Sequence, residues 1–498
     1  MPREELQNLA LRRQLFFPTA EIYANAPAGF WEFGPIGVRI RNNIINFWRK
    51  ELVERERLLE IKGSVILPRE VFEASGHLKS FNDPVVQCKK CHALFRADKL
   101  IEEKIAKHIP ESKSIKEINA LLAEHKIRCP KCKGELSEAR LFNMMMRVLI
   151  GATQNQECFL RPETCQNIFL DFLRLYKASR EGLPLGIAQA GSSFRNEIAP
   201  KQTLLREREL GQMEIEIFFN PDKINEIKNF STVADYKLRL QRLGKDSIEE
   251  ISCEQAVKQR IVSGKLIAYW IARLQQFYEK CGIALEKMRF RELDAEERAF
   301  YAKETWDFEV LTDLGWIELV ACNYRTDYDL KGHSKGSKKD LSAKEDGKAF
   351  IPHVFELSAG IDRTFYVVLD QAIRKEKRGK DERLYLALVP QLAPYFVAVF
   401  PLVSKDGLPK KAKQVFDLLE DYKFSCLYDE KGSIGRRYAR VDEIGVPYAI
   451  TIDYDTMKDD TVTIRERNTM AQKRVKIAEL PEILWKLSVG KLSFGEIK

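Results

Sequence analysis

The sequence is poor in the residues and patterns that mark several common protein classes. Its 498 residues include only 10 Cys and 6 His, and its 26 Gly and 19 Pro follow no repeat. Ten Cys are too few for a disulfide-rich secreted protein of this length, so we expect free thiols in a reducing compartment. Gly and Pro without a period exclude a collagen-like chain. The hydrophobic share of 45% excludes disorder as the main state.

Long apolar runs are also missing. The most apolar stretch, 388–403, is interrupted by three prolines and a glutamine, whereas a membrane-spanning helix needs about 20 apolar residues. The first five residues lack the apolar region of a secretory signal. We therefore expect a cytoplasmic protein without a membrane span. The formal net charge of +9 permits a nucleic acid partner without requiring one.

The residues that are present divide the chain into segments. Residues 1–87 combine an amphipathic helix at 38–59 with a strand-like run at 61–67, which stops at Pro68. Residues 88–132 begin and end with Cys pairs. This pattern predicts an N-terminal part of a larger domain, followed by an insertion built around its cysteines.

The rest of the chain reads as two further parts. Residues 133–373 are predicted to alternate strands and helices. A helical insertion is expected near 223–300, with helices near 223–243 and 254–281. A mobile polar loop is expected at 331–348. The nearly all-charged segment 374–383 is expected to be a solvated linker. Residues 384–498 then read strand, helix, strand, helix, strand, which predicts a compact α/β module.

The Cys pairs predict a metal site. Cys88-x-x-Cys91 and Cys129-x-x-Cys132 can each present two thiolates to one tetrahedral ion, and four thiolates suit a structural zinc. The gap between the pairs is longer than usual because a helical segment, 99–127, is inserted. His92 could compete as a ligand. The competing interpretation is two unrelated turns or a redox pair.

Three strand-like segments carry acids on one face, since residues i and i+2 of a strand point the same way. Arg195 and Glu197 share a face, as do Gln212, Glu214 and Glu216 in the next strand. These two strands predict a hairpin with a long polar tip. Further on, Glu318 is expected to point with Val320 and Cys322, and Glu356 with Ser358. Arg363 follows in the first turn of a helix.

Acids and arginines on one sheet face suggest a site for Mg²⁺, a polyphosphate and an ammonium group together, because guanidinium groups pair with phosphate oxygens. No Gly-x-x-x-x-Gly-Lys-Ser/Thr phosphate loop occurs, so the site would not be a P-loop. For any one strand alone, a solvated sheet face is the more common explanation of such alternation.

The motifs themselves resemble those of the class II aminoacyl-tRNA synthetases. Phe194-Arg-Asn-Glu197 resembles motif 2, Gly360-Ile-Asp-Arg363 resembles motif 3, and 38–68 resembles motif 1, the dimer-interface element. Within the class, the chain is most similar to the homodimeric glycyl-tRNA synthetases. The stretches that carry this likeness are Leu160–Thr164, Arg208–Glu214, Arg325–Leu330, Glu356–Gly360 and Thr461–Arg465.

The resemblance implies an α/β (α+β) fold: an antiparallel sheet flanked by helices, a zinc-ribbon-like insertion and a C-terminal α/β anticodon-binding domain. It implies glycine–tRNA ligase activity through a glycyl-adenylate, with ATP, glycine and tRNA as partners, Mg²⁺ and structural Zn²⁺ as cofactors, and a homodimer formed through motif 1. Of the catalytic group Arg195, Glu197, Glu318 and Arg363, Arg195 would grip the α-phosphate, Arg363 the γ-phosphate, Glu197 the adenine side and Glu318 the Mg²⁺.

Further site residues follow from the resemblance. ATP would be contacted by Arg195, Asn196, Glu197, Leu205, Arg206, Leu210, Glu318, Leu319, Gly360 and Arg363. Glycine would be contacted by Arg96, Glu163, Gln212, Glu214, Arg325, Glu356 and Ser358. Zinc would be held by Cys88, Cys91, Cys129 and Cys132. The chain departs from the family pattern at Cys165, Asn167, Val320, Ala321 and Leu357, which we expect to alter the pocket wall.

Two alternatives belong to other classes of function. One is a non-catalytic nucleic-acid-binding or regulatory protein on the same scaffold, and the other is a class II synthetase for another small amino acid. The presence of all four catalytic residues favours an enzyme, and three acids at 163, 214 and 356 favour glycine. Basic candidates for tRNA contact are 331–348, 374–383 and Arg436, Arg437 and Arg440, although such runs are more often solvated surface.

Overall fold

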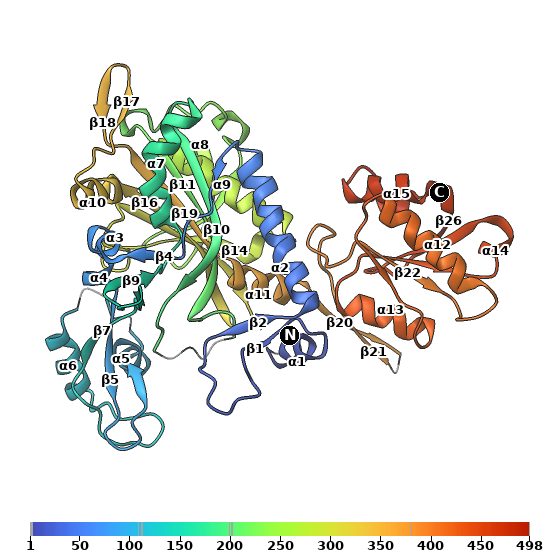
Figure 1. The fold of residues 1–498 in the computed structure, drawn as a ribbon, viewed down its shortest axis with the longest axis horizontal. Coiled ribbons are helices and arrows are strands. Elements are labelled where there is room, and N and C mark those ends of the chain that lie inside the picture. Colours follow the sequence, from blue (N-terminus) through green and yellow to red (C-terminus); the bar gives the residue numbers. More distant parts are fainter. Residues whose placement is uncertain are drawn as a thin grey trace.

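The computed structural model describes residues 3–107, 109–110, 113–198, 200, 203–379 and 381–497. Figure 1 shows a large central body, a small module built from residues near 100 at one end, and a C-terminal domain at the other. No helix in these described ranges is long and apolar enough to cross a membrane.

The central body is built on a nine-stranded sheet in the order β13-β12-β14-β15-β16-β19-β11-β10-β3. All neighbours pair antiparallel except β3 with β10 and β12 with β14. The expected antiparallel sheet is thus confirmed. The strands that carry the predicted motifs are β10 (Leu185–Phe194), β11 (Glu209–Phe219), β15 (Glu304–Thr312), β16 (Gly315–Thr326) and β19 (His353–Gly360).

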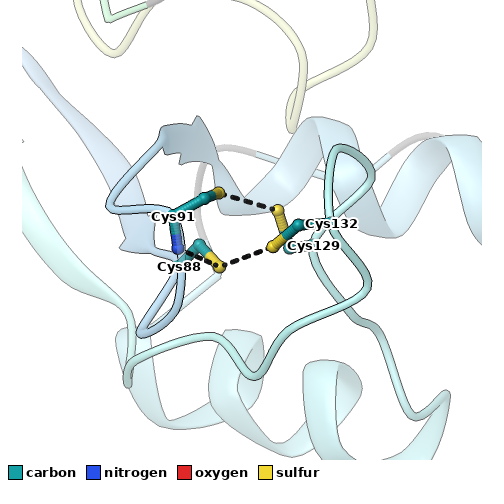
Figure 2. Close-up of side chains that lie close together, drawn as sticks. All are labelled: Cys88, Cys91, Cys129 and Cys132. Carbon is teal, nitrogen blue, oxygen red and sulfur yellow. Dashed lines mark hydrogen bonds between the residues drawn. The ribbon is translucent and has the colours of Figure 1, made fainter.

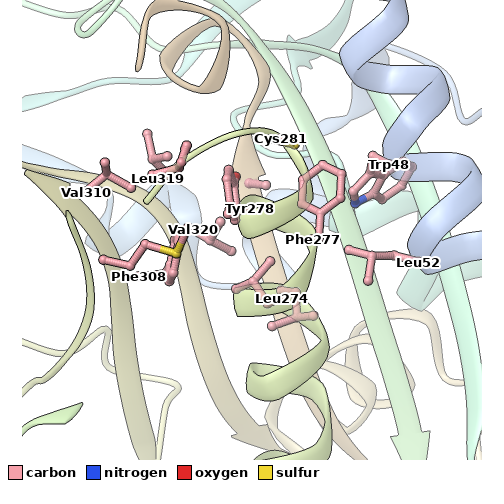
Figure 3. Close-up of a cluster of buried hydrophobic side chains, with 14 of the residues drawn as sticks. Trp48, Leu52, Leu274, Phe277, Tyr278, Cys281, Phe308, Val310, Leu319 and Val320 are labelled. Atoms are coloured by element: carbon pink, nitrogen blue, oxygen red, sulfur yellow. The ribbon is translucent and has the colours of Figure 1, made fainter. Parts of the chain in front are cut away.

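One face of this sheet is covered by helices and fixes the strand register. Helices α2 (Pro35–Trp48), α9 (Lys265–Lys280) and α11 (Ile361–Ala372) contribute to the largest apolar core. Figure 3 shows Phe277 and Tyr278 of α9 between Trp48 on one side and Phe308 and Val320 of the sheet on the other. A one-residue slip of a strand would expose these apolar side chains, so the opposite, polar face is fixed as well.

The other face is partly covered by α7 (Cys165–Ser179), whose Ile168, Phe169 and Phe172 pack with Leu185 and Phe218 in a second core. The N-terminal helix expected at 38–59 is α2 continued by a π-helical turn, η1 (Arg49–Glu54). The strand run expected at 61–67 is broken. Only β3 (Leu59–Glu60) and β4 (Ile66–Pro68) pair with neighbours.

The helical insertion expected near 223–300 is wrong in its first half. Residues 223–243 hold a short 3-10 turn, η3 (Phe230–Thr232), and strand β12 (Lys237–Gln241), in which Leu238 and Leu240 are buried with a period of two. The segment continues with β13 (Ile248–Ser252), α8 (Cys253–Lys258), α9 and β14 (Met288–Glu292), so the helical stretch expected near 254–281 is two helices with a break at 259–264. It therefore extends the main sheet instead of standing apart from it.

Two further expectations about charged segments are corrected. The polar stretch 331–348 is not a loop, because it contains most of α10 (Tyr328–Ser337) and the hairpin β17 (Ala343–Glu345) and β18 (Lys348–Phe350). The linker 374–383 lies in an antiparallel hairpin, β20 (Ile373–Arg378) and β21 (Asp381–Leu386). Arg383 of this hairpin donates to Asp442 of the C-terminal domain at 2.8 Å, which anchors it.

The small module holds the Cys pairs. It consists of β5 (Asn82–Gln87), β6 (Leu94–Arg96), α5 (Ala97–Ile105), α6 (Ile115–Glu124) and β7 (Arg140–Asn143), with its own apolar core. The helical character of 99–127 is therefore confirmed for its described residues. The strands β5 and β7 pair with each other, so the module extends past both ends of 88–132.

The C-terminal domain is the expected α/β module. Its five-stranded sheet has the order β23-β22-β24-β25-β26, made of β22 (Val397–Pro401), β23 (Cys426–Tyr428), β24 (Tyr448–Ile452), β25 (Thr461–Glu466) and β26 (Gln472–Lys476). Helices α12 (Leu408–Asp421), α13 (Ile434–Glu443) and α15 (Leu480–Ser488) flank it. It contacts the central body through Arg13, which donates to Glu443 at 2.5 Å, and Asn43, which donates to the Ala393 carbonyl at 2.7 Å.

Candidate functional site

A cavity of about 390 Å³ opens on the polar face of β11, β16 and β19, a size typical of small-molecule sites. Most residues predicted for ATP and glycine line it: Glu163, Arg195, Glu197, Leu205, Arg206, Leu210, Gln212, Glu318, Leu319, Glu356, Ser358, Gly360 and Arg363. Four predicted residues do not line it: Arg96, Asn196, Glu214 and Arg325.

Strand register brings the polar residues together. Glu356 of β19 lies opposite Asn323 of β16 on one side and Glu216 of β11 on the other. Ser358 lies in the same way between Ala321 and Glu214. Two adjacent rows of polar side chains therefore cross three strands that are not consecutive in the sequence.

Glu318 reaches this face because of a β-bulge. The register between β15 and β16 shifts at Phe308/Glu309, so that Val320 pairs with Phe308 while Glu318 pairs with Glu309. An extra residue in one strand reverses the alternation of side chains. The expectation that Glu318 points with Val320 and Cys322 is therefore wrong. Those two are buried in the apolar core, and Glu318 lines the cavity with Ala321 and Asn323.

Two arginines supply positive charge to the cavity. Arg195 Nε donates to the Pro162 carbonyl at 3.1 Å, and its guanidinium lies 5.6 Å from the Phe81 ring. Arg363 Nε donates to the Leu205 carbonyl at 3.1 Å, and its Nη1 contacts Glu318 Oε2 at 3.2 Å. Both guanidinium groups are fixed at one edge, so that their other nitrogens can bind an anion.

A second arginine network lies where the small module meets the central body. Arg206 Nε donates to Glu197 Oε2 at 2.6 Å, and Arg206 Nη2 lies 4.0 Å from Asp83. Arg96 contacts Asp83 at 3.0 Å and Asp98 at 3.1 Å. Arg96 is thus linked to the cavity through Asp83 and Arg206. Asn196 is held nearby by its backbone N–H, which donates to the Met144 carbonyl at 2.8 Å.

Glu214 lies just behind the cavity wall. Its Oε1 accepts from Ser358 Oγ at 2.5 Å and from Gln212 Nε2 at 3.2 Å, while its Oε2 accepts from the Thr164 hydroxyl. The residues in front of it, Gln212 and Ser358, are the ones that line the cavity. Glu214 therefore orients both of them.

Arg325 is also behind the wall, with a side chain only 1% exposed. It makes a bidentate pair with Asp329, at 2.7 Å for each bond, and donates to Glu356 Oε2 at 2.5 Å. Its guanidinium stacks on Tyr301 at 3.7 Å from the ring centroid. The arginine supports Glu356 from behind and has no open route to the cavity.

The buried acids differ in charge. Burial acts against ionisation of Glu163, but His77 and Arg325 beside it hold its pKa well below the usual range. Burial, and then the charge of Glu163, raises the pKa of Glu214. Burial, against the opposing effect of Arg325, raises the pKa of Glu356 to about 7. Burial and the neighbouring Glu356 raise the pKa of Glu216 well above the usual range, and among the described residues neither of its carboxyl oxygens has a hydrogen-bond partner.

Several cavity residues escaped the sequence interpretation, among them Thr305, Asp307, Tyr301, Asn323 and Glu297. Asp307 lies opposite Ala321 on β15, close to Glu318. Burial, and then the charge of Glu318, raises the pKa of Asp307 well above the usual range. Two neighbouring carboxyl groups suit a bound divalent cation. The alternation of residues 305–309 was the signal that could have identified Asp307.

The departures from the family pattern lie in different places. Val320 and Leu357 are buried in the apolar core on the far face, so they do not alter the pocket wall as expected. Asn167 accepts from Arg161 Nη1 at 3.1 Å beneath the sheet end. Cys165 is buried beside Glu214 and Glu216. Only Ala321 faces the cavity directly.

The four predicted cysteines come together in the small module (Figure 2). Cys88 and Cys132 sulfurs are 3.5 Å apart, and Cys91 and Cys129 sulfurs are 3.6 Å apart. A tetrahedral zinc with Zn–S bonds of about 2.3 Å requires sulfur separations of about 3.8 Å. The cluster therefore fits zinc closely. His92, expected as a competing ligand, is exposed and outside the cluster.

The two Cys pairs share one backbone design. His92 N–H donates to the Cys88 carbonyl at 3.0 Å, and Lys133 N–H donates to the Cys129 carbonyl at 2.9 Å. His92 and Lys133 both have a positive φ, of 56° and 59°. The N–H groups of Lys90 and Cys91 both donate to Cys88 Sγ at 3.4 Å, and the Cys91 bond contributes most to lowering the pKa of that thiol. Such donors stabilise thiolates, the form that binds metal.

The basic candidates in the C-terminal domain separate by burial. Arg437 is only 1% exposed, and it donates to the carbonyls of Leu402 and Gly432 at 3.1 Å each, so it supports the fold. Arg440 pairs with Asp429, at 3.0 Å from its Nε. Arg436 is exposed, and it remains available for an anionic partner.

Comparison with known proteins identifies two domains. Residues 149–372 match the family described as the tRNA synthetase class II core domain (G, H, P, S and T). Residues 396–487 match the family described as the anticodon binding domain.

Full-length relatives give a finer assignment. The chain is 37% identical to the glycine–tRNA ligase of Methanothrix thermoacetophila, over 99% of this chain and 98% of the relative. It is 38% identical to that of Pyrococcus furiosus, over 98% and 99%. It is 39% identical to that of Methanocaldococcus jannaschii, over 97% and 98%.

Proposed function

Because this chain belongs to the glycine–tRNA ligases, a family of class II aminoacyl-tRNA synthetases, it is an enzyme that joins glycine to tRNA at the expense of ATP. We propose that this reaction takes place in the cavity on β11, β16 and β19. The observation that carries this proposal is one concave face where the register of three strands places carboxyl groups and where the guanidinium groups of Arg195 and Arg363 also lie.

In the proposed complex, ATP occupies the end of the cavity lined by Arg195, Arg363 and Glu318. The guanidinium of Arg195 binds the α-phosphate, and that of Arg363 binds the γ-phosphate. Glu197 lies on the adenine side, where Arg206 now holds its carboxylate at 2.6 Å. Glu318 and Asp307 would hold Mg²⁺, which neutralises phosphate charge when bound.

Glycine would occupy the end lined by Glu163, Glu356 and Ser358. Its ammonium would pair with the ionised Glu163 and hydrogen bond to Ser358, while Glu214 and Arg325 act from behind the wall. An added side chain would collide with closely packed residues, and overpacking is costly. Glycine has no smaller competitor to reject, so steric exclusion suffices for selection.

The chemistry then needs only positioning and charge stabilisation. The glycine carboxylate attacks the α-phosphorus, the bond to the bridging oxygen breaks, and pyrophosphate leaves. Arg195 and Arg363 stabilise the charge that develops on the phosphate oxygens. The 3′ hydroxyl of tRNA then attacks the glycyl carbonyl, and AMP leaves. The C-terminal domain would bind the anticodon, with Arg436 as an exposed contact.

The remaining expectations are part of the same proposal. Residues 1–87 and 133–373 would form the catalytic domain, 88–132 the zinc-binding insertion, and 384–498 the anticodon-binding domain. Two copies would associate through the motif 1 region, which sedimentation over a range of concentrations tests. The ligase would act in the cytoplasm, where tRNA is used for translation.

Glycine-dependent exchange of pyrophosphate into ATP tests the proposed site without tRNA. The purified chain with Mg²⁺ and ATP should give exchange with glycine and with none of the other nineteen amino acids. Arg195→Ala should abolish exchange and change the thermal transition little, because the Arg195 side chain makes one hydrogen bond within the described part of the chain, to the Pro162 carbonyl, and alanine keeps the backbone hydrogen bonds. Exchange near the wild-type rate in this variant would refute the role of Arg195.

A further inference from the structure

We propose that His77, Gln166 and His333 form a positioning relay that fixes Glu163 so that one of its carboxylate oxygens faces the glycine ammonium. This inference rests on the proposed function, because it takes Glu163 to be an ammonium ligand. The relay residues come from three separate elements and are all buried: His77 is 5% exposed, Gln166 0% and His333 3%.

Three donors converge on the same oxygen of Glu163. Gln166 Nε2 donates to Oε1 at 2.7 Å, His77 Nε2 lies 3.3 Å from Oε1, and Arg325 Nη2 lies 3.9 Å from it. Glu163 also lines the cavity. These contacts hold one carboxylate oxygen in place, and in this proposal the carboxylate presents its other oxygen to the ligand.

Each donor is itself oriented by a further contact. His333 Nε2 lies 2.8 Å from Gln166 Oε1, which can only accept, so His333 must carry its proton on Nε2. That contact fixes the amide of Gln166 with its NH₂ toward Glu163. Ser75 Oγ lies 2.8 Å from His77 Nδ1 and can donate to it, and in that arrangement His77 carries its proton on Nε2, toward Glu163.

The relay adds no positive charge through His333. Burial lowers the pKa of His333 to about 4, so this imidazole is neutral at working pH. A neutral donor orients Glu163 without repelling the ammonium that the site must attract. Orientation is worth most for this substrate, because glycine offers only an ammonium and a carboxylate for recognition and each contact carries a large share of the binding.

Local structure explains how His77 reaches the pocket. Gly76 adopts φ of 84°, a left-handed turn that favours glycine, and His77 begins the short helix α4 (His77–Ser80) directly after it. The His77 ring also packs edge-on against Phe72 and Phe81, at 6.1 and 5.7 Å between ring centroids. His77→Phe would keep this packing and remove the donor to Glu163, together with the contact between His77 Nδ1 and Ser75 Oγ.

The test compares glycine and ATP kinetics in pyrophosphate exchange. His77→Phe and Gln166→Met should each raise the KM for glycine by about tenfold or more, since each removes a hydrogen bond to a charged group. The KM for ATP and kcat at saturating glycine should stay within about twofold of wild type, because uniform substrate binding is what is lost. His77→Gln, which restores an N–H donor, should recover most of the loss.

A matched control is His353→Phe on β19. His353 contacts Tyr324 at 2.7 Å and lies 4.0 Å from Asp327, but it has no contact with Glu163. Its KM for glycine should equal that of wild type. Thermal unfolding of every variant would show whether the fold is kept, and if one relay variant does not fold, the other decides.

The outcomes separate this inference from the proposed function. A wild-type chain without glycine-dependent exchange would refute the proposed function. An active wild type whose relay variants keep the KM for glycine within about twofold would overturn the relay alone. Equal increases in KM for glycine and ATP would also overturn it, because they indicate a general structural defect.

Discussion

Replacing Arg325 by Met tests whether this arginine is a buried support or a direct glycine contact. The side chain is 1% exposed and holds Asp329 at two distances of 2.7 Å and Glu356 at 2.5 Å. Methionine has a similar length, so the chief change is the loss of a guanidinium between two carboxylates. Asp329 is also 1% exposed and Glu356 3%, so water cannot replace the lost donors.

The expected cost is large. Removing one partner of a buried ion pair typically destabilises a protein by about 3–5 kcal/mol, because the other charge is left buried and unpaired. A domain is stable by only about 5–15 kcal/mol, so Arg325→Met should remove a substantial part of the stability of the catalytic domain. Glu356 should also lose its opposing positive charge, become protonated more easily, and attract the glycine ammonium less.

Differential scanning calorimetry measures the first effect, and exchange kinetics measure the second. The transition of the catalytic domain should move to lower temperature, while that of the C-terminal domain stays in place. Arg174→Met is the matched control, because Arg174 is 83% exposed and lies 3.9 Å from Asp171. Exposed pairs contribute about 0–1 kcal/mol. If the two variants unfold at the same temperature, the reasoning about Arg325 is refuted.

Three further predictions concern pH, metal and RNA. Burial raises the pKa of Glu356 to about 7. Between about pH 4.5 and 7 the folded chain therefore keeps a proton on Glu356 that the unfolded chain does not, and the free energy of unfolding should fall as pH rises through this window. Urea titrations should show a weaker fall in Glu356→Gln. Cys129→Ser should lose bound zinc in elemental analysis, whereas Cys158→Ser, buried outside the cluster, should keep it. Arg436→Ala should weaken tRNA binding, measured by filter binding, with no change in thermal stability. Arg437→Ala should destabilise the C-terminal domain in calorimetry, because Arg437 is buried against the Leu402 and Gly432 carbonyls. The reverse pattern would contradict the burial argument.

Local patterns in the sequence predicted the elements that carry the site. Alternation in Leu210–Phe219 and His353–Ala359 placed Glu214 and Glu356 on the polar face of their strands, and the structure has them there. The Cys pairs predicted a cluster that the structure forms. These predictions succeed because the side chains involved are two or three residues apart, and a strand or a tight turn fixes their relative positions.

The failures have physical causes beyond local sequence. The face of Glu318 was wrong because a β-bulge changes the alternation, and nothing in residues 315–320 marks the extra residue. The helix expected at 223–243 was wrong. The alternation of the buried Leu238 and Leu240 is typical of a strand, but it covers only a few residues of a charged stretch, so a helix was predicted there instead. The linker at 374–383 forms a hairpin because Arg383 pairs with Asp442, about sixty residues away.

The same limit explains why the relay around Glu163 could not be predicted. His77, Gln166 and His333 are separated by 89 and 167 residues, and each by itself is more often an ordinary buried polar residue. What distinguishes them is that their contacts end, directly or through Gln166, on one oxygen of a carboxylate that lines the cavity.

The balance of buried charge gives these observations a common reason. Carboxyl groups of Glu163, Glu214, Glu216, Glu356 and Asp329 share one corner of the sheet with the guanidinium groups of Arg325 and Arg161. Burial opposes so many negative charges, so some carboxyl groups there must hold protons while the pocket is empty. An ammonium group is the ligand that would complete this balance. A pocket with an excess of acids would therefore attract a small substrate that carries an ammonium group, in agreement with the proposed glycine site.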